Sequence, residues 1–177
     1  MRVLFVCSGN ICRSAMAEAF LRRALEEHSI AGDVRSVGFA KAGLPSPPDT
    51  IEAMRRHGLD ITGHRSQSIS VPALDGADLV LAMTGRHVRE AVVMSPGARD
   101  RIWGFGELVR LGEEHGGRRG APVQDWLSLL APHRQAPLSL DDVEDPHGRA
   151  SKVHRRVADQ VLDLTTRLVT LMWDPVT

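Results

Sequence analysis

The chain has 177 residues, 42% hydrophobic and 4% aromatic, and its 22 basic side chains balance its 22 acidic ones. This balance gives no electrostatic indication of a nucleic-acid or membrane partner. No segment approaches the roughly 18 consecutive apolar residues of a membrane span, and the first apolar run is too short for a secretory signal peptide. Two cysteines do not make a disulfide framework. We therefore expect a cytoplasmic protein that forms one domain over residues 1–177.

Strand and helix patterns alternate along the chain. In chain order they predict a strand at 2–6, a helix from Ser14, a strand at 33–37, a helix at 48–57, a strand at 78–83, a helix capped by Thr84, a short strand at 101–103 and a helix over 153–171. Strands that alternate with helices indicate βαβ units and a parallel sheet, so the fold class is α/β.

Residues 112–139 interrupt this alternation. The segment is rich in residues that break regular structure: Gly112, Gly116, Gly117, Gly120, Pro122, Pro132 and Pro137. Apart from one or two helical turns around 126–130, it predicts a long, partly mobile loop excursion and not a second domain.

The stretch FVCSGNICRSAMAEAF, residues 5–20, joins the first predicted strand to the first helix through a tight loop. At such a junction the backbone N–H groups and the helix dipole favour an anion. Cys7 supplies a nucleophile in its thiolate form, which a helix N-terminus favours. Arg13 carries a planar, permanent charge that matches two phosphate oxygens. The loop therefore predicts a binding site for a tetrahedral oxyanion with a thiol at its base.

Three other interpretations of this loop are weaker. A zinc site built on Cys7 and Cys12 lacks further cysteines, because the chain contains only these two. A dinucleotide-binding loop would need the pattern G-x-G-x-x-G, which is absent. A buried, inert thiol is the ordinary reading of one isolated cysteine. The joint presence of Gly9, Asn10 and Ser14 beside Cys7 and Arg13 favours the oxyanion site.

The sequence VCSGNICRS resembles the signature V-C-x-G-N-x-C-R-S of the low-molecular-weight protein-tyrosine phosphatase family. Weaker matches follow in the family's order: SVGF, HGLDITGHRSQ, ADLVLAMT and DPHG. The resemblance implies a single-domain, three-layer αβα fold with a central, mostly parallel four-stranded sheet. It also implies a phosphatase that hydrolyses phosphomonoesters of phosphorylated proteins or small molecules, phosphotyrosine above all, through a phosphocysteine intermediate. Neither a cofactor nor a metal is expected, because the arginine and the amides supply positive charge.

The resemblance implies a role for each loop residue. Cys7 is the expected nucleophile, and the expected phosphate-binding residues are Ser8, Gly9, Asn10, Ile11, Cys12, Arg13 and Ser14. Ser36 and His64 match family positions that hydrogen-bond the asparagine and serine of the loop. The other histidines show no metal-ligand spacing, and we expect His28, His57, His87 and His115 at the surface.

A general acid is expected in the segment DDVEDPHG, whose carboxylates are Asp141, Asp142, Glu144 and Asp145. Asp145 is the predicted acid, because Pro146 and Gly148 form a rigid turn that can aim it and because Asp-Pro resembles the family's acid loop. Asp142 is the second candidate.

The substrate and the role of Cys12 stay open. Ala42 stands where the family often has an aromatic residue, with Phe39 nearby, and Ile11 argues against phosphoarginine because family members specific for it carry threonine there. An arsenate reductase of this fold would need a third cysteine. A non-catalytic oxyanion-binding or regulatory module, or a phosphatase for another phosphoester, is the alternative. Cys12 is either a small loop filler or a disulfide partner of Cys7.

Overall fold

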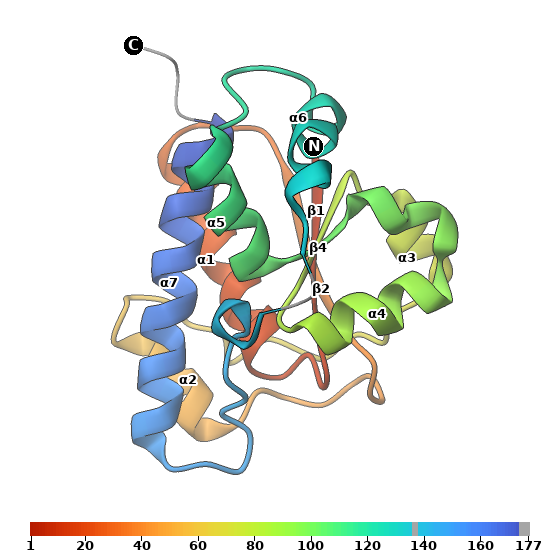
Figure 1. Cartoon of the computed structure of the whole chain (residues 1–177). Helices are drawn as coiled ribbons and strands as arrows, with labels where there is room; N and C mark the ends of the chain where they lie inside the picture. Colours follow the sequence, from red (N-terminus) through yellow and green to blue (C-terminus); the bar gives the residue numbers. More distant parts are fainter. Residues whose placement is uncertain (136–137, 174–177) are drawn as a thin grey trace.

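The computed structural model describes residues 1–135 and 138–173 and shows a parallel sheet of four strands between two layers of helices (Figure 1). The strand order is β2-β1-β3-β4. The strands are β1 Arg2–Cys7, β2 Asp33–Gly38, β3 Leu79–Ala82 and β4 Ile102–Gly104. Cys7 stands opposite Gly38, and Val6 stands opposite both Val37 and Ala82. The predicted α/β fold and parallel sheet are confirmed, and the carboxyl ends of the strands meet at one edge.

The helices cover both faces of the sheet (Figure 1). The larger layer contains α1 Arg13–Glu27, α2 Pro48–Arg55, α5 Phe105–His115 and α7 Ser151–Trp173. The opposite face is covered by α3 Val71–Gly76, α4 Gly85–Met94 and the 3-10 turn Pro96–Arg101. This arrangement follows from the alternation of side chains along β1, because Val3 and Phe5 join the core on one face, and Leu4 and Val6 the core on the other.

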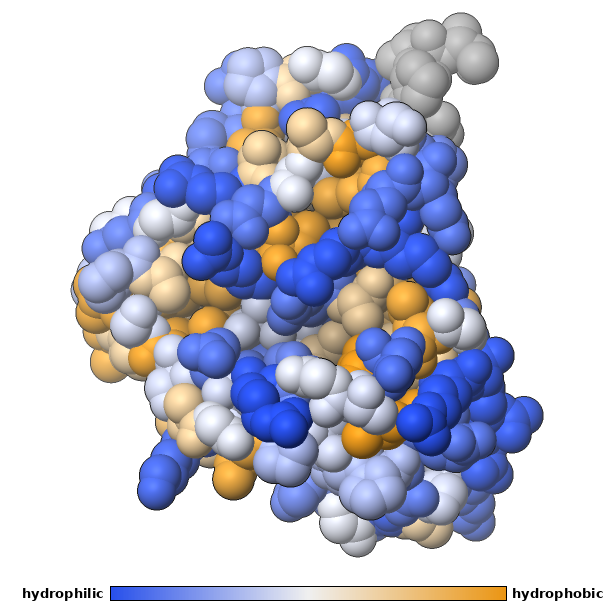
Figure 2. Space-filling model, turned by 180° about the vertical axis from the view of Figure 1, so that it is seen from behind, coloured by the Kyte–Doolittle hydropathy of each residue, from blue (hydrophilic) through white to orange (hydrophobic). Residues whose placement is uncertain are grey.

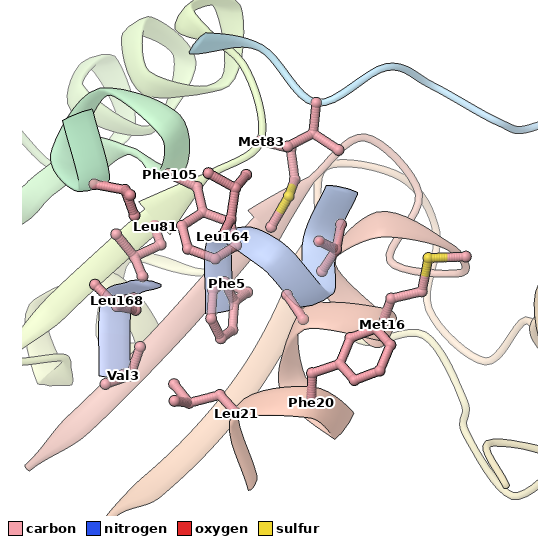
Figure 3. Packing of buried hydrophobic residues seen from close by; sticks show 14 of the residues in the cluster. Val3, Phe5, Met16, Phe20, Leu21, Leu81, Met83, Phe105, Leu164 and Leu168 are labelled. Atoms are coloured by element: carbon pink, nitrogen blue, oxygen red, sulfur yellow. The ribbon is translucent and has the colours of Figure 1, made fainter. Parts of the chain in front are cut away.

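The main core lies between the sheet and the larger helical layer (Figure 3). Phe5 of β1 contacts Phe105 at the start of α5, with ring centroids 5.3 Å apart. Leu164 and Leu168 of α7 belong to the same core cluster (Figure 3). Burying one such side chain stabilises the fold by about 1.5–3 kcal/mol, so this layer holds the end of β1 and the start of α1 rigidly.

The predicted helical turns around 126–130 are confirmed as α6, but the rest of the predicted loop excursion at 112–139 needs correction. Residues 112–115 are the last turn of α5, and α6 Val123–Leu130 buries Trp126, Leu127 and Leu130. Gly112 is not a helix breaker here, because a Cβ on it would lie 2.9 Å from Leu171 Cδ1 and 3.0 Å from Trp126 Cζ2. The glycine lets α6 and α7 approach α5 closely. Residues 136–137 of the predicted excursion lie outside the described residues.

The surface facing the viewer in Figure 2 is mostly hydrophilic, with apolar groups between the charged side chains. Within the described residues, the exposed large apolar side chains are Leu44, Val71, Val93, Leu129 and Leu140. No helix of the described part of the chain combines the length and apolar character that crossing a membrane requires.

Candidate active site

The loop between β1 and α1 curls around the sulfur of Cys7. The Cys7 side chain is buried, and its Sγ accepts a hydrogen bond of 3.2 Å from the backbone N–H of Asn10. Ser14 Oγ lies 3.0 Å from the same sulfur. Asn10 adopts a left-handed conformation with φ 51°, which asparagine tolerates better than most residues. Local chemistry thus explains why this sequence turns back on its own thiol.

Asn10 connects the loop to its surroundings. Its Nδ2 donates to Ser14 Oγ at 2.9 Å and to Ser36 Oγ at 2.7 Å, while its Oδ1 accepts from the Gln67 N–H at 2.7 Å. His64 Nε2 lies 2.6 Å from the Asn10 carbonyl oxygen, to which it donates. The structure therefore brings both predicted supporting residues, Ser36 and His64, to Asn10. Ser14 accepts from the amide, which leaves its hydroxyl proton available to the Cys7 sulfur.

Glu18 belongs to this group of residues and was not predicted. Its carboxylate accepts from the Ser36 hydroxyl and pairs with Arg22 one helical turn later. The carboxylate makes Ser36 a donor to Glu18 and hence an acceptor for the Asn10 amide. Sequence analysis missed Glu18 because one acidic residue on a helix is ordinarily a solvated side chain.

Gly38 is packed directly against the loop. A Cβ on Gly38 would lie 2.6 Å from Asn10 N and 2.9 Å from Ser8 O, both of them backbone atoms. Gly38→Ala is therefore expected to displace the loop, to destabilise the fold by about 1–3 kcal/mol and to lower kcat/KM. Gly97→Ala is the matched control, because its Cβ would meet nothing within 4 Å. Chemical denaturation and initial rates measure both effects; equal behaviour of the two variants would contradict the prediction.

Arg13 lies under the loop with its side chain 4% exposed. Its NH1 donates to the Val143 carbonyl at 3.2 Å, and its NH2 donates to Asp145 Oδ2 at 2.6 Å and to Ser8 Oγ at 3.3 Å. Among the described residues, no acceptor lies within hydrogen-bond distance of the buried Nε. A buried guanidinium nitrogen without a partner is costly, so the loop is suited to an anion that supplies one.

The four carboxylates before α7 have different partners. Asp145 contacts Arg13, while its Oδ1 accepts from the His147 N–H at 3.1 Å in a turn that Gly148 completes with φ 72°. Asp142 Oδ1 accepts from the Gly85 N–H at 2.8 Å, at the start of α4. Asp141 pairs with Arg110, and Glu144 pairs with Arg156. Asp145, the predicted acid, is therefore the carboxylate that the structure places against Arg13.

Cys12 belongs to the loop, and its side chain is part of a separate buried group with Thr50 and His154. Thr50 Oγ1 of α2 donates to Cys12 Sγ at 3.2 Å and lies 2.9 Å from His154 Nδ1 of α7. Burial raises the pKa of the Cys12 thiol to about 11, against the opposing effect of the Thr50 hydrogen bond. Burial also lowers the pKa of His154. Both cysteines are free thiols, and Cys12 is protonated near neutral pH.

His87 contradicts the prediction of a surface residue. It is 1% exposed, and its Nε2 lies 2.9 Å from Ser8 Oγ in the loop, 79 positions away. Burial lowers its pKa to about 4, and the charge of Arg13 acts in the same direction. The prediction that Thr84 caps α4 is confirmed, because Thr84 Oγ1 accepts from the His87 N–H. This cap could have indicated from the sequence that His87 lies near the loop, since it places His87 in the first turn of a helix that begins at the sheet edge.

Apolar side chains lie beside the loop. A Cβ on Gly9 would lie 3.4 Å from Ile11 Cγ1, so the Ile11 side chain reaches over the glycine. The Phe39 ring stacks on His87 with centroids 5.9 Å apart, and the Phe39 N–H donates to the Cys7 carbonyl at 3.2 Å. Within residues 1–135 and 138–173, no group of three His, Cys, Asp or Glu side chains is arranged to hold a metal ion.

Comparison with known proteins agrees with this geometry. The family of low molecular weight phosphotyrosine protein phosphatases matches residues 2–117, which include the loop but end before Asp145. A probable low molecular weight protein-tyrosine-phosphatase, EpsP, from Ralstonia solanacearum is 40% identical over 106 residues, covering 60% of this chain and 71% of the relative. A protein-arginine-phosphatase from Bacillus subtilis is 28% identical over 169 residues, covering 95% and 94%.

A solved structure extends the similarity beyond the matched residues. The low molecular weight protein tyrosine phosphatase from T. tengcongensis is 32% identical, with a TM-score of 0.75. The alignment covers 96% of this chain and 97% of that one, so it includes the segment that carries Asp145 and α7. The chain therefore belongs to the low molecular weight phosphotyrosine protein phosphatase family.

Proposed function

We propose that this protein hydrolyses phosphomonoesters through a phosphocysteine intermediate on Cys7, with phosphotyrosine in proteins as its substrate class. The observation that carries the proposal is the contact between Arg13 of the loop and Asp145, which are 132 positions apart in sequence. It joins a thiol, an anion-binding arginine and a carboxylate in one place. Loss of turnover in Cys7→Ser, described in the Discussion, is the direct test.

The proposed reaction uses these groups in two steps. The Cys7 thiolate attacks phosphorus in line, and Asp145 protonates the leaving oxygen as the P–O bond breaks. Arg13 and the N–H groups at the start of α1 hold the equatorial oxygens and stabilise their charge. Phosphate oxygens compete with the Asp145 carboxylate for Arg13, which frees Asp145 to face the leaving group. Water then hydrolyses the phosphocysteine, and Asp145 takes its proton.

The apolar residues beside the loop support an aromatic phosphoester. Ile11 lies over Gly9, and Phe39 is the first residue after β2 and donates its backbone N–H to the Cys7 carbonyl. These side chains offer apolar surface to a phenyl ring, which gains free energy when it leaves water. A phosphoseryl group is too short to use that surface.

Phosphoarginine is the second candidate substrate. The Bacillus subtilis relative is named a protein-arginine-phosphatase and aligns with nearly the whole chain. Ile11 favours phosphotyrosine instead, because an isoleucine leaves the polar guanidinium of phosphoarginine without a hydrogen-bond partner at that position. The choice therefore depends on the side chain at position 11.

A substrate panel tests this choice. Matched peptides carrying phosphotyrosine, phosphoarginine or phosphoserine are incubated with wild type and with Ile11→Thr, and phosphate release is measured with and without EDTA. We expect wild type to prefer phosphotyrosine by about tenfold or more, and Ile11→Thr to lose part of that preference. A wild-type preference for phosphoarginine would reject the proposed substrate. Loss of activity in EDTA that zinc or magnesium restores would reject the metal-independent mechanism.

We also propose that the chain works as one domain in a reducing compartment, the cytoplasm. The site draws on residues from Cys7 at the start of the chain to Asp145 near its end, which supports a single catalytic unit. A thiolate nucleophile beside a second free thiol is active only where cysteines stay reduced, which supports the cytoplasm.

A further inference from the structure

His87 is a buried imidazole that the proposed reaction does not use. It stands in the first turn of α4 and contacts Ser8 of the loop. Both of its ring nitrogens have partners: Nε2 lies 2.9 Å from Ser8 Oγ, and Nδ1 lies 3.0 Å from Thr84 Oγ1. The Phe39 ring stacks on its face. The imidazole is thus oriented from three directions.

The two ring contacts fit either neutral tautomer of His87, because the hydroxyls of Ser8 and Thr84 can each donate or accept. Arg13 NH2 donates to Ser8 Oγ at 3.3 Å, and a guanidinium has no acceptor. Ser8 Oγ therefore accepts from Arg13, and in one of the two neutral tautomers of His87 it directs its own proton to an unprotonated Nε2. In that tautomer Nδ1 carries the ring proton and donates it to Thr84 Oγ1. The pKa of about 4 agrees with this neutral imidazole at physiological pH.

We propose that His87 is a positioning residue, which accepts the Ser8 hydroxyl proton and so keeps the Ser8 oxygen turned toward Arg13. The proposal rests on the proposed phosphatase function and adds to it the group that orients one side of the arginine. Asp145 and Ser8 share the NH2 nitrogen of Arg13, and Val143 binds NH1. When phosphate displaces Asp145, Ser8 remains the partner that holds this nitrogen. Without His87 the Ser8 hydroxyl would be free to rotate and to present its proton to the guanidinium.

Two conservative variants separate this role from a structural one. His87→Gln places its amide oxygen near the position of Nε2 and keeps an acceptor for Ser8. His87→Asn keeps a donor near Nδ1 for Thr84 but does not reach Ser8. We expect His87→Asn to raise KM for p-nitrophenyl phosphate, and the inhibition constant of inorganic phosphate, by about 3–10-fold. His87→Gln should stay within about twofold of wild type. Equal losses in both variants, or none, would overturn the proposal.

A double-mutant cycle with Ser8→Ala tests whether the effect passes through Ser8. If it does, His87→Asn has little further effect on KM or on phosphate inhibition once Ser8 is alanine. Full additivity would show that His87 acts by another route. Thermal unfolding of each variant is measured in parallel, because a merely structural histidine would lower the melting temperature without this dependence on Ser8.

The wild-type protein offers a test that needs no variant. Nitrogen-15 chemical shifts of the His87 ring distinguish the two neutral tautomers, and we expect the Nδ1–H form at pH 7. The Nε2–H form or an imidazolium would overturn the proposal, even with an active enzyme. Wild type without any turnover of p-nitrophenyl phosphate would instead reject the proposed function, whichever tautomer is observed.

Discussion

Cys7→Ser is expected to abolish turnover of p-nitrophenyl phosphate and phosphotyrosine peptides, by about 10³-fold or more, while phosphate binding persists. A serine hydroxyl forms no accessible anion near neutral pH, so the attack on phosphorus fails. Arg13 and the start of α1 are unchanged, so the groups that bind the anion remain. Initial rates measure the first effect, and titration calorimetry with inorganic phosphate measures the second.

Cys12→Ser is the matched control for this experiment. It makes the same substitution in the same loop, but at a thiol that faces Thr50 and has a pKa of about 11. We expect it to retain most of the wild-type rate. Turnover by Cys7→Ser at more than about a tenth of the wild-type rate would remove Cys7 as the nucleophile. Wild type that binds phosphate but releases none from any ester would indicate the non-catalytic module.

Asp145→Asn is expected to lower kcat by roughly 10²–10⁴ for poor leaving groups and by much less for activated ones. An amide cannot deliver the proton that a poor leaving oxygen needs, whereas nitrophenolate leaves with little help. Asparagine keeps the side-chain oxygen that contacts Arg13, so the geometry of the loop changes little. The measurement is kcat for a series of aryl phosphates against the pKa of the leaving phenol, in which the variant should show a steeper dependence.

Asp142→Asn tests the assignment of the acid. Asp142 accepts from the Gly85 N–H, and the asparagine oxygen can keep that hydrogen bond. We expect kcat near the wild-type value for every leaving group. If the dependence on the leaving group appears in Asp142→Asn and not in Asp145→Asn, the assignment of the acid is wrong.

The strand–loop–helix junction at Cys7 and the alternation of strands and helices could be predicted because both are patterns among neighbours in the sequence. The strand, the tight turn and the helix that carry Cys7 and Arg13 occupy one continuous stretch. The geometry of a strand–loop–helix junction follows from this local pattern, and so does its attraction for an anion. The turn at Asp145 is equally local, since Pro146 and Gly148 fall within three residues of it. These are the parts of the site for which chemistry and spacing were sufficient.

Local sequence patterns did not predict the role of two glycines in packing. In the sequence, Gly112 and Gly38 cannot be distinguished from a glycine in a turn. Only the distance from an added Cβ to a neighbouring element shows their role. At Gly112 that neighbour is α7, and at Gly38 it is the loop. A glycine that permits close approach therefore reads as a breaker until its neighbour in space is known.

By itself, the sequence determined the thiol, the arginine, the alternation of the strands with α1, α2, α4 and α7, and the carboxylate best placed in a turn, because each is set by residues within a few positions. It did not indicate α3 or α5. Tertiary structure alone decided which partners surround the residues of the site. His87 contacts Ser8 from 79 positions away, and Thr50 and His154 meet Cys12 from α2 and α7. Their burial and hydrogen bonds arise when helices pack on the sheet, so a histidine that seems an ordinary surface residue in sequence becomes buried against Ser8 of the loop, with a lowered pKa.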